Sequence, residues 1–114
     1  MPPRDLALRI ADILDSIGRI ERYTAGMTFD AFEADEKTTD AVLWNFQVIG
    51  EAARHVPAEV SARFPGIPWA EMCGMRNVIV HQYFGVDLEI VWQTIRDRLP
   101  PLVAALHRLL DEEQ

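Results

Sequence analysis

Apolar residues recur every three or four positions in two long stretches of the chain. The repeating positions are Leu6, Ile10, Ile13, Leu14, Ile17 and Ile20 in the first stretch, and Val42, Phe46, Ile49, Ala53 and Val56 in the second. Charged residues fall mostly on the other faces, and this spacing is typical of amphipathic helices. The first helix is predicted from residue 4 to about Gly26, and the second from the acidic segment 35–40 to Arg54 or His55.

The remaining segments are shorter, and Pro and Gly residues mark their boundaries. We predict a polar connection over 28–34 that can hold one turn of helix, a short helix within 57–64 and a turn over 65–68. A third main helix is predicted to open at Pro68-Trp69, a fourth has Asp87 as its N-cap, and a fifth runs from Leu102 and ends in a frayed acidic tail over 111–114. Pro100-Pro101 must break or bend the chain between the last two helices, because proline lacks the N–H that a helix needs.

These segments define the predicted fold class. The sequence shows no convincing strand alternation, no internal repeat and no low-complexity segment. We therefore predict an all-α fold in which residues 1–114 form a single domain, an antiparallel bundle of four to five helices joined by short loops.

Composition and charge narrow the functional classes. The formal net charge is −7 and the pI is near 4.8, which argues against a generic nucleic-acid binder because phosphate contacts need a basic surface. No apolar run approaches the roughly 20 residues that span a bilayer, and the N-terminus lacks a signal-peptide pattern. Cys73 is the single cysteine, which suits a reducing compartment, so we expect a cytoplasmic protein.

The second predicted helix contains a cluster of small residues, Gly50, Ala52 and Ala53. Small side chains let a neighbouring helix approach closely, so a tight helix crossing is one interpretation. The other is that Gly50-Glu51 borders a functional groove. The three tryptophans are interpreted as core or interface residues: Trp44, Trp69 and Trp92.

The third predicted helix combines an apolar surface with a group of polar residues that includes Arg76, Asn77, His81 and Tyr83. On an ideal helix Arg76 shares a sector with Tyr83, whereas Asn77 and His81 lie on another side, and Arg76 and His81 are about 140° apart. Either the helix ends or distorts near His81, or two chains pool these residues in one cleft. Because the helix is apolar nearly all round, we expect a two-fold homodimer to cover one of its faces.

These residue types suit metal-independent RNA cleavage. A histidine with a pKa near its usual value of about 6.5 can take the proton from a ribose 2′-hydroxyl or protonate the leaving 5′-oxygen. The Arg76 guanidinium can bind the phosphate oxygens, and Asn77 can orient the imidazole or the phosphate. The structural alternative is that His81 is a hydrogen-bonded structural residue and Arg76 reaches a carboxylate such as Glu51.

Other chemistry has little support in the sequence. The three histidines are far apart and form no H-x-x-x-H pair, so no metal site is predicted. No Gly-rich phosphate loop and no Ser-His-Asp pattern is visible, and no cofactor is predicted.

Two segments resemble a known family. The motif Arg-Asn-Val-Ile-Val-His-Gln-Tyr over 76–83, followed by Phe-Gly-Val-Asp over 84–87 and Val-Trp-Gln-Thr-Ile over 91–95, resembles the HepT-like branch of the HEPN superfamily. Residues 41–53, which contain Gly-Glu-Ala-Ala, resemble the second-helix signature of that family. The length and helical pattern agree as well, so the resemblance covers nearly the whole chain. An R-x-x-x-x-H string alone is common, but these additions make the match fairly specific.

The resemblance implies a homodimeric ribonuclease that is the toxin of a type II-like toxin–antitoxin module. It implies that Arg76 and His81 are catalytic at the dimer cleft and that Asn77 supports them. The antitoxin of this family is a minimal, MntA-like nucleotidyltransferase that adds AMP to the motif tyrosine, here Tyr83. The alternatives are a non-catalytic adaptor that binds such a nucleotidyltransferase and a purely structural bundle.

Overall fold

The structure is a computed structural model, and it describes residues 4–74 and 87–113. All regular secondary structure in these residues is helical, which confirms the predicted all-α class. The elements are α1 (Arg4–Thr24), α2 (Phe29–Ala34), α3 (Glu36–Arg54), α4 (Ala58–Arg63), a helical segment over 69–74, α6 (Leu88–Gln93), a π-helical segment η2 (Thr94–Arg98) and α7 (Leu99–Glu112).

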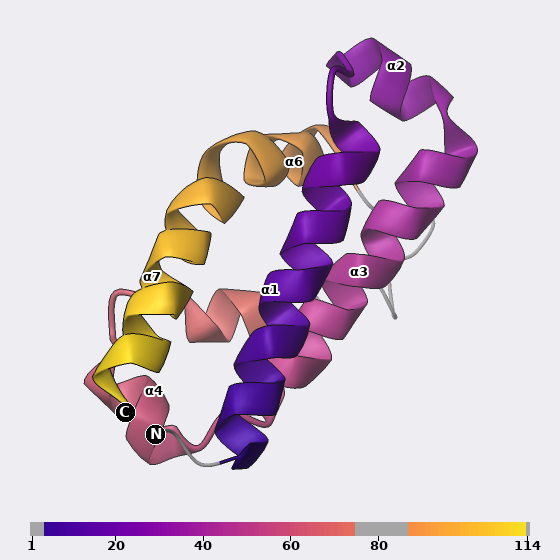
Figure 1. Cartoon of the computed structure of the whole chain (residues 1–114). Coiled ribbons are helices and arrows are strands. Elements are labelled where there is room, and N and C mark those ends of the chain that lie inside the picture. Colours follow the sequence, from indigo (N-terminus) through magenta and orange to yellow (C-terminus); the bar gives the residue numbers. More distant parts are fainter. Residues whose placement is uncertain (1–3, 75–86, 114) are drawn as a thin grey trace.

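Helices α1 and α3 form the centre of the fold, running antiparallel with α2 joining them at one end (Figure 1). Local signals set their ends. Gly26 has a positive φ of 76° just after α1, a conformation that glycine adopts at little cost. Asp35 is the N-cap of α3, and its carboxylate accepts a hydrogen bond of 3.1 Å from the Thr38 backbone N–H, which lowers the pKa of Asp35. Both boundaries lie close to the predicted ones.

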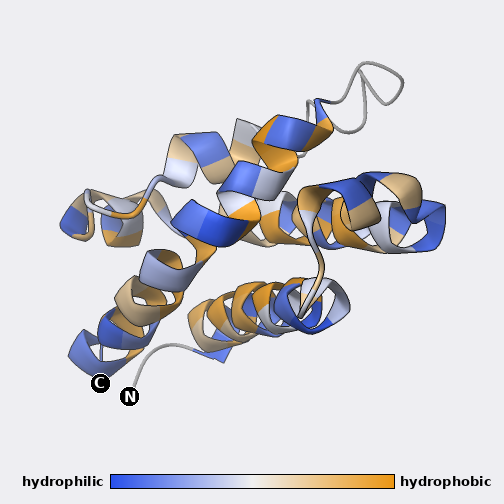
Figure 2. Ribbon diagram, turned by 90° about the horizontal axis from the view of Figure 1, so that it is seen from above, coloured by the Kyte–Doolittle hydropathy of each residue, from blue (hydrophilic) through white to orange (hydrophobic). Residues whose placement is uncertain are grey.

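The core consists of the apolar stripes that the sequence pattern predicts. Figure 2 shows hydrophobic (orange) faces of the helices turned mostly toward one another and hydrophilic (blue) faces turned mostly outward. On α1 the buried stripe is Leu6, Ile10, Ile13, Ile17 and Ile20, and on α3 it includes Val42, Phe46, Ile49 and Ala53. Helix α7 packs against α1 and adds Leu102, Leu106 and Leu109. The two predicted amphipathic helices are therefore confirmed.

The C-terminal end corrects one prediction. The acidic tail was expected to fray, but α7 continues to Glu112. The carboxylate of Glu113 accepts a hydrogen bond of 3.1 Å from Arg63 Nε, and this contact raises the pKa of Arg63. The ion pair joins Glu113, at the end of α7, to Arg63 of α4, which is 50 positions earlier in the chain. Residues 111–113 of the tail therefore continue from α7 and contact a distant cation that the local sequence pattern does not reveal.

The segment from α6 to α7 bends without breaking. Asp87 is the N-cap of α6, as predicted, and its carboxylate accepts a hydrogen bond of 2.9 Å from Glu89 N–H. In η2 the Leu99 N–H donates to the Thr94 carbonyl, one residue farther back than in an α-helix. The cause is Pro100-Pro101, because neither proline can donate to the carbonyl four residues before it and each ring crowds that carbonyl. The wider turn relieves this conflict.

The tryptophans differ in their environments. Trp92 stacks against Phe32 with ring centroids 5.1 Å apart, and the Arg96 guanidinium lies 5.7 Å from the Trp92 ring centre, so this residue packs α6 against α2. Trp69 is partly buried and packs against the core. Trp44 is 62% exposed on α3, so the core interpretation is wrong for this residue, and the interface interpretation stays a prediction.

Candidate functional site

The predicted site residues lie outside the described part of the structure. Arg76, Asn77, His81 and Tyr83 all fall within residues 75–86, between the end of the helical segment at Gly74 and the α6 N-cap at Asp87. The angular separation of Arg76 and His81 and the roles assigned to all four residues therefore stay predictions.

The helical segment that leads to the motif is firmly anchored. The Met72 N–H donates a hydrogen bond of 3.0 Å to the Pro68 carbonyl, which closes its first turn. The Trp69 indole Nε1–H donates a hydrogen bond of 3.0 Å to the Phe64 carbonyl and fixes the segment to the preceding turn. Pro68-Trp69 thus opens this helix, as the sequence pattern predicts.

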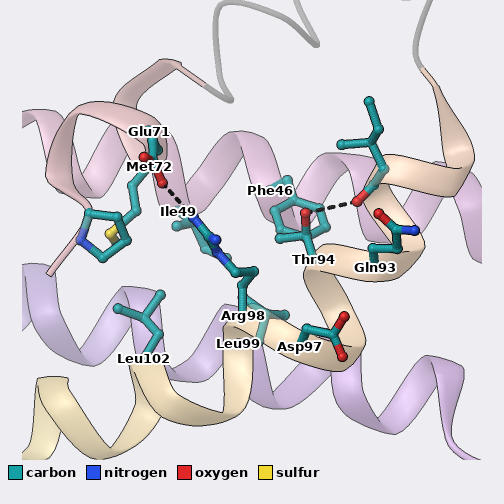
Figure 3. Close-up of a pocket in the computed structure, with 12 residues that line it drawn as sticks. Phe46, Ile49, Glu71, Met72, Gln93, Thr94, Asp97, Arg98, Leu99 and Leu102 are labelled. Carbon is teal, nitrogen blue, oxygen red and sulfur yellow. Dashed lines mark hydrogen bonds and ion pairs between the residues drawn. The ribbon is translucent and has the colours of Figure 1, made fainter.

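A pocket of about 440 Å³ lies beside this segment (Figure 3). Its lining comes from α3, from residues 68–72 and from the α6–η2–α7 arm: Phe46, Ile49, Pro68, Glu71, Met72, Ile90, Gln93, Thr94, Asp97, Arg98, Leu99 and Leu102. The floor is buried and apolar, and the polar side chains gather on the rim. The volume falls within the range of small-molecule sites.

The rim has a defined set of donors and acceptors. Arg98 Nη2 donates a hydrogen bond of 2.9 Å to Glu71 Oε2 across the pocket mouth (Figure 3), and both side chains are more than half exposed. The Thr94 hydroxyl donates to the Ile90 carbonyl at 2.8 Å. Within the described residues, the Asp97 carboxylate has no hydrogen-bond or ion-pair partner. The rim therefore offers a guanidinium, an amide from Gln93 and carboxylate acceptors.

A second hollow of about 340 Å³ lies on the outer side of α1 and α3. It is lined by Arg9, Asp12, Trp44, Gln47, Val48, Glu51 and Ala52. Glu51 Oε1 also lies 3.2 Å from Nε2 of His55, the C-cap residue of α3. Glu51 therefore borders a surface hollow that also contains an exposed tryptophan, whereas Gly50 does not line it. A functional role for this groove stays a prediction.

The described residues contain neither a candidate metal site nor a candidate membrane span. In residues 4–74 and 87–113, no group of three or more His, Cys, Asp and Glu side chains is placed to hold a metal ion. Among the helices of the same ranges, none combines the length and the apolar character that crossing a membrane requires.

Comparison with known proteins identifies the class. The family model described as Ribonuclease HepT-like matches residues 13–109, which include both the motif and the described pocket. The chain therefore belongs to the HepT-like family of the HEPN superfamily, and the resemblance found in the sequence is confirmed.

Individual relatives agree with this assignment. The chain is 37% identical over 100 residues to "Probable ribonuclease HepT" of Thermococcus cleftensis, covering 88% of this chain and 91% of that protein. It is 33% identical over 112 residues to "Putative RNase MJ0127" of Methanocaldococcus jannaschii, covering 98% of this chain and 93% of that protein. No solved structure matches the chain.

Sequence reasoning did not find the pocket. Its polar rim comes from Glu71 and from the arm around η2, and none of these residues stood out in the helical pattern. The available signal was Pro100-Pro101, which predicts a distortion just before it. Because π-helical turns are frequent at functional sites, the two prolines point to the segment just before them as a candidate site.

Proposed function

We propose that this protein is a metal-independent endoribonuclease and the toxin of a type II-like toxin–antitoxin module. The observation that carries the proposal is the family match over residues 13–109, because the complete Arg76-x4-His81 motif lies inside it. The ribonuclease names of the relatives support the same activity. A nucleotidyltransferase antitoxin that adds AMP to Tyr83 is the proposed inhibitor.

The proposed chemistry is attack by the ribose 2′-hydroxyl on the adjacent phosphorus. His81 takes the 2′-hydroxyl proton, the new O–P bond forms, and the bond to the 5′-oxygen breaks. That oxygen takes a proton from water as it leaves, so the products are a 5′-hydroxyl and a 2′,3′-cyclic phosphate. Arg76 binds the non-bridging oxygens as their charge rises, while Asn77 orients the imidazole or the phosphate.

The direct test is cleavage of single-stranded RNA by the purified protein in EDTA. We expect fragments with 2′,3′-cyclic phosphate ends, and growth arrest when the wild-type gene is expressed alone. The absence of both cleavage and growth arrest would refute the ribonuclease proposal and leave the non-catalytic adaptor as the better function. Cleavage that disappears in EDTA would contradict the metal-independent mechanism.

The active unit is proposed to be a homodimer in which two chains pool their motif residues. The surface around Trp44 supports a second copy there, because an exposed tryptophan lies next to a hollow on the same face. In a two-fold interface the same patch meets itself, so each Trp44 can enter the hollow of the partner. Buried aromatic anchors of this kind dominate the energetics of many interfaces.

Replacing Trp44 with lysine is expected to dissociate the dimer. The wild type should have a mass of about 26 kDa by light scattering, twice the chain mass of 13.0 kDa, and Trp44→Lys should approach the monomer mass. The matched control is Tyr23→Lys, because Tyr23 is also an exposed aromatic residue, on α1, but does not line the hollow. A monomeric wild type would refute the shared cleft, and a dimeric Trp44→Lys would place the interface elsewhere.

A further inference from the structure

We propose that the 440 Å³ pocket binds a guanine base of the RNA substrate beside the bond that is cleaved. The position of this base relative to cleavage rests on the proposed ribonuclease function, whereas its binding to the pocket does not. The argument uses the apolar floor, the charges of the rim and the place of the pocket along the chain.

The floor of the pocket is suited to a flat aromatic group. Phe46, Ile49 and Met72 are each at least 93% buried and form one apolar surface with Leu99 and Leu102. Unstacked RNA bases are commonly held in apolar sites and against aromatic side chains. A base that enters this pocket removes its own apolar faces from water, while the floor, which is already buried, supplies a packed apolar surface for contact.

The rim argues for a base and against a phosphate. It carries two carboxylates, Glu71 and Asp97, and one guanidinium, Arg98, which is already hydrogen-bonded to Glu71. A phosphate group would face more negative than positive charge and would gain little from a cation that is already paired. Neutral bases have N–H groups that donate to carboxylates, so the same rim favours them.

Guanine matches the rim better than the other bases. Its O6 and N7 are acceptors for the two N–H groups of an arginine fork, here Arg98. Its N1–H and N2–H₂ are adjacent donors for one carboxylate, here Asp97, whose oxygens have no partner among the described residues. Cytosine and adenine have a ring acceptor next to their exocyclic amine, and uracil has one ring N–H between two carbonyl oxygens, so none of them offers two adjacent donors. Because the Arg98–Glu71 pair is exposed, rearranging it costs little.

The pocket also lies close to the motif along the chain. Met72 lines the pocket and precedes Arg76 by four residues, a length of chain that spans at most about 14 Å. The opposite wall includes Thr94, Asp97 and Arg98 of the π-helical segment, a type of turn that is frequent at functional sites. A base held between these walls would position the neighbouring phosphodiester for cleavage.

The first experiment maps the cleavage sites on an unstructured RNA that contains every pair of neighbouring bases. The wild type should cut next to guanosines at least about tenfold more often than next to other bases, which is the discrimination of one bidentate contact. Asp97→Asn should lose this preference, because the amide replaces one of the two carboxylate acceptor oxygens with an NH2 group, which is a donor. The control Asp111→Asn should keep it, because Asp111 is exposed on α7 and does not line the pocket.

The second experiment measures binding without cleavage. Guanosine 5′-monophosphate should give saturable NMR shifts, with AMP, CMP and UMP binding at least about tenfold more weakly, and Asp97→Asn should abolish this selectivity. Binding of GMP without any RNA cleavage would refute the proposed function and leave the base site standing. Cleavage without base preference, combined with no GMP selectivity, would overturn the base site and leave the ribonuclease standing.

A third variant tests a competing occupant. Gln93→Trp places a large side chain at the pocket mouth without changing the buried floor. It should block GMP binding and leave the oligomeric mass unchanged. A change in oligomeric mass with GMP binding retained would show that the pocket receives a second copy of the chain, and would overturn the proposal.

Discussion

The His81→Ala variant is expected to cleave RNA at least about a hundredfold more slowly than the wild type. Proton transfer by a positioned side chain contributes roughly 10²- to 10⁴-fold to such reactions, and alanine has no titratable group to replace the imidazole. The wild-type rate should depend on pH near the histidine pKa of about 6.5, and the residual rate of the variant should lose that dependence. The measurement is initial rates on one fluorescent RNA in EDTA across this pH range.

The matched control for this experiment is His107→Ala. His107 is exposed on α7 and is the same residue type at a position with no proposed role in catalysis. It should retain the wild-type rate and pH profile. Equal midpoints of urea unfolding for all three proteins would show that a lost rate is chemical in origin. A full rate in His81→Ala would remove this residue from the mechanism.

The Tyr83→Phe variant is expected to accept no adenylate from the cognate nucleotidyltransferase. In the proposed reaction the tyrosine oxygen attacks the α-phosphorus of ATP, the bond to the β-phosphate breaks, pyrophosphate leaves, and the phenolic proton passes to solvent. Phenylalanine keeps the ring but has no oxygen to attack. Intact-protein mass spectrometry after incubation with the transferase and ATP should show one added AMP on the wild type and none on the variant.

The chain provides a built-in control, because it has two tyrosines. Tyr23→Phe changes the other one, which is partly exposed on α1, and should be modified like the wild type. The adenylated wild type should also lose RNA cleavage, since the modification adds bulk and negative charge beside the motif. Unchanged labelling of Tyr83→Phe would place the modification at another residue.

The parts of the fold that the sequence predicted well are those set by local chemistry. Asp35 and Asp87 cap their helices with side-chain hydrogen bonds a few residues away, and Gly26 supplies a backbone conformation that other residues avoid. The apolar stripes of α1 and α3 were equally readable, because burial repeats with the helical period.

The features that were missed depend on contacts between distant segments. The contact at the end of α7 involves Arg63, which is 50 residues from Glu113. The exposure of Trp44 depends on how α1 and α3 pack, and a helical pattern marks apolar residues without saying which of them stay exposed. The pocket joins three separate parts of the chain, so no single stretch of sequence could have revealed it.

The π-helical segment can also be described by helical phase. Val91, Ile95 and Leu99 are all at least 95% buried, yet eight residues from Val91 to Leu99 would turn an α-helix about 80° beyond two full turns. A spacing of seven residues would turn the helix only about 20° less than two full turns, which would keep the three side chains on one face. The α6–η2–α7 arm therefore contains one residue more than its buried face requires, and the wide turn absorbs it. Because that turn supplies Thr94, Asp97 and Arg98, removing one residue there would leave the core in phase and remove the pocket wall.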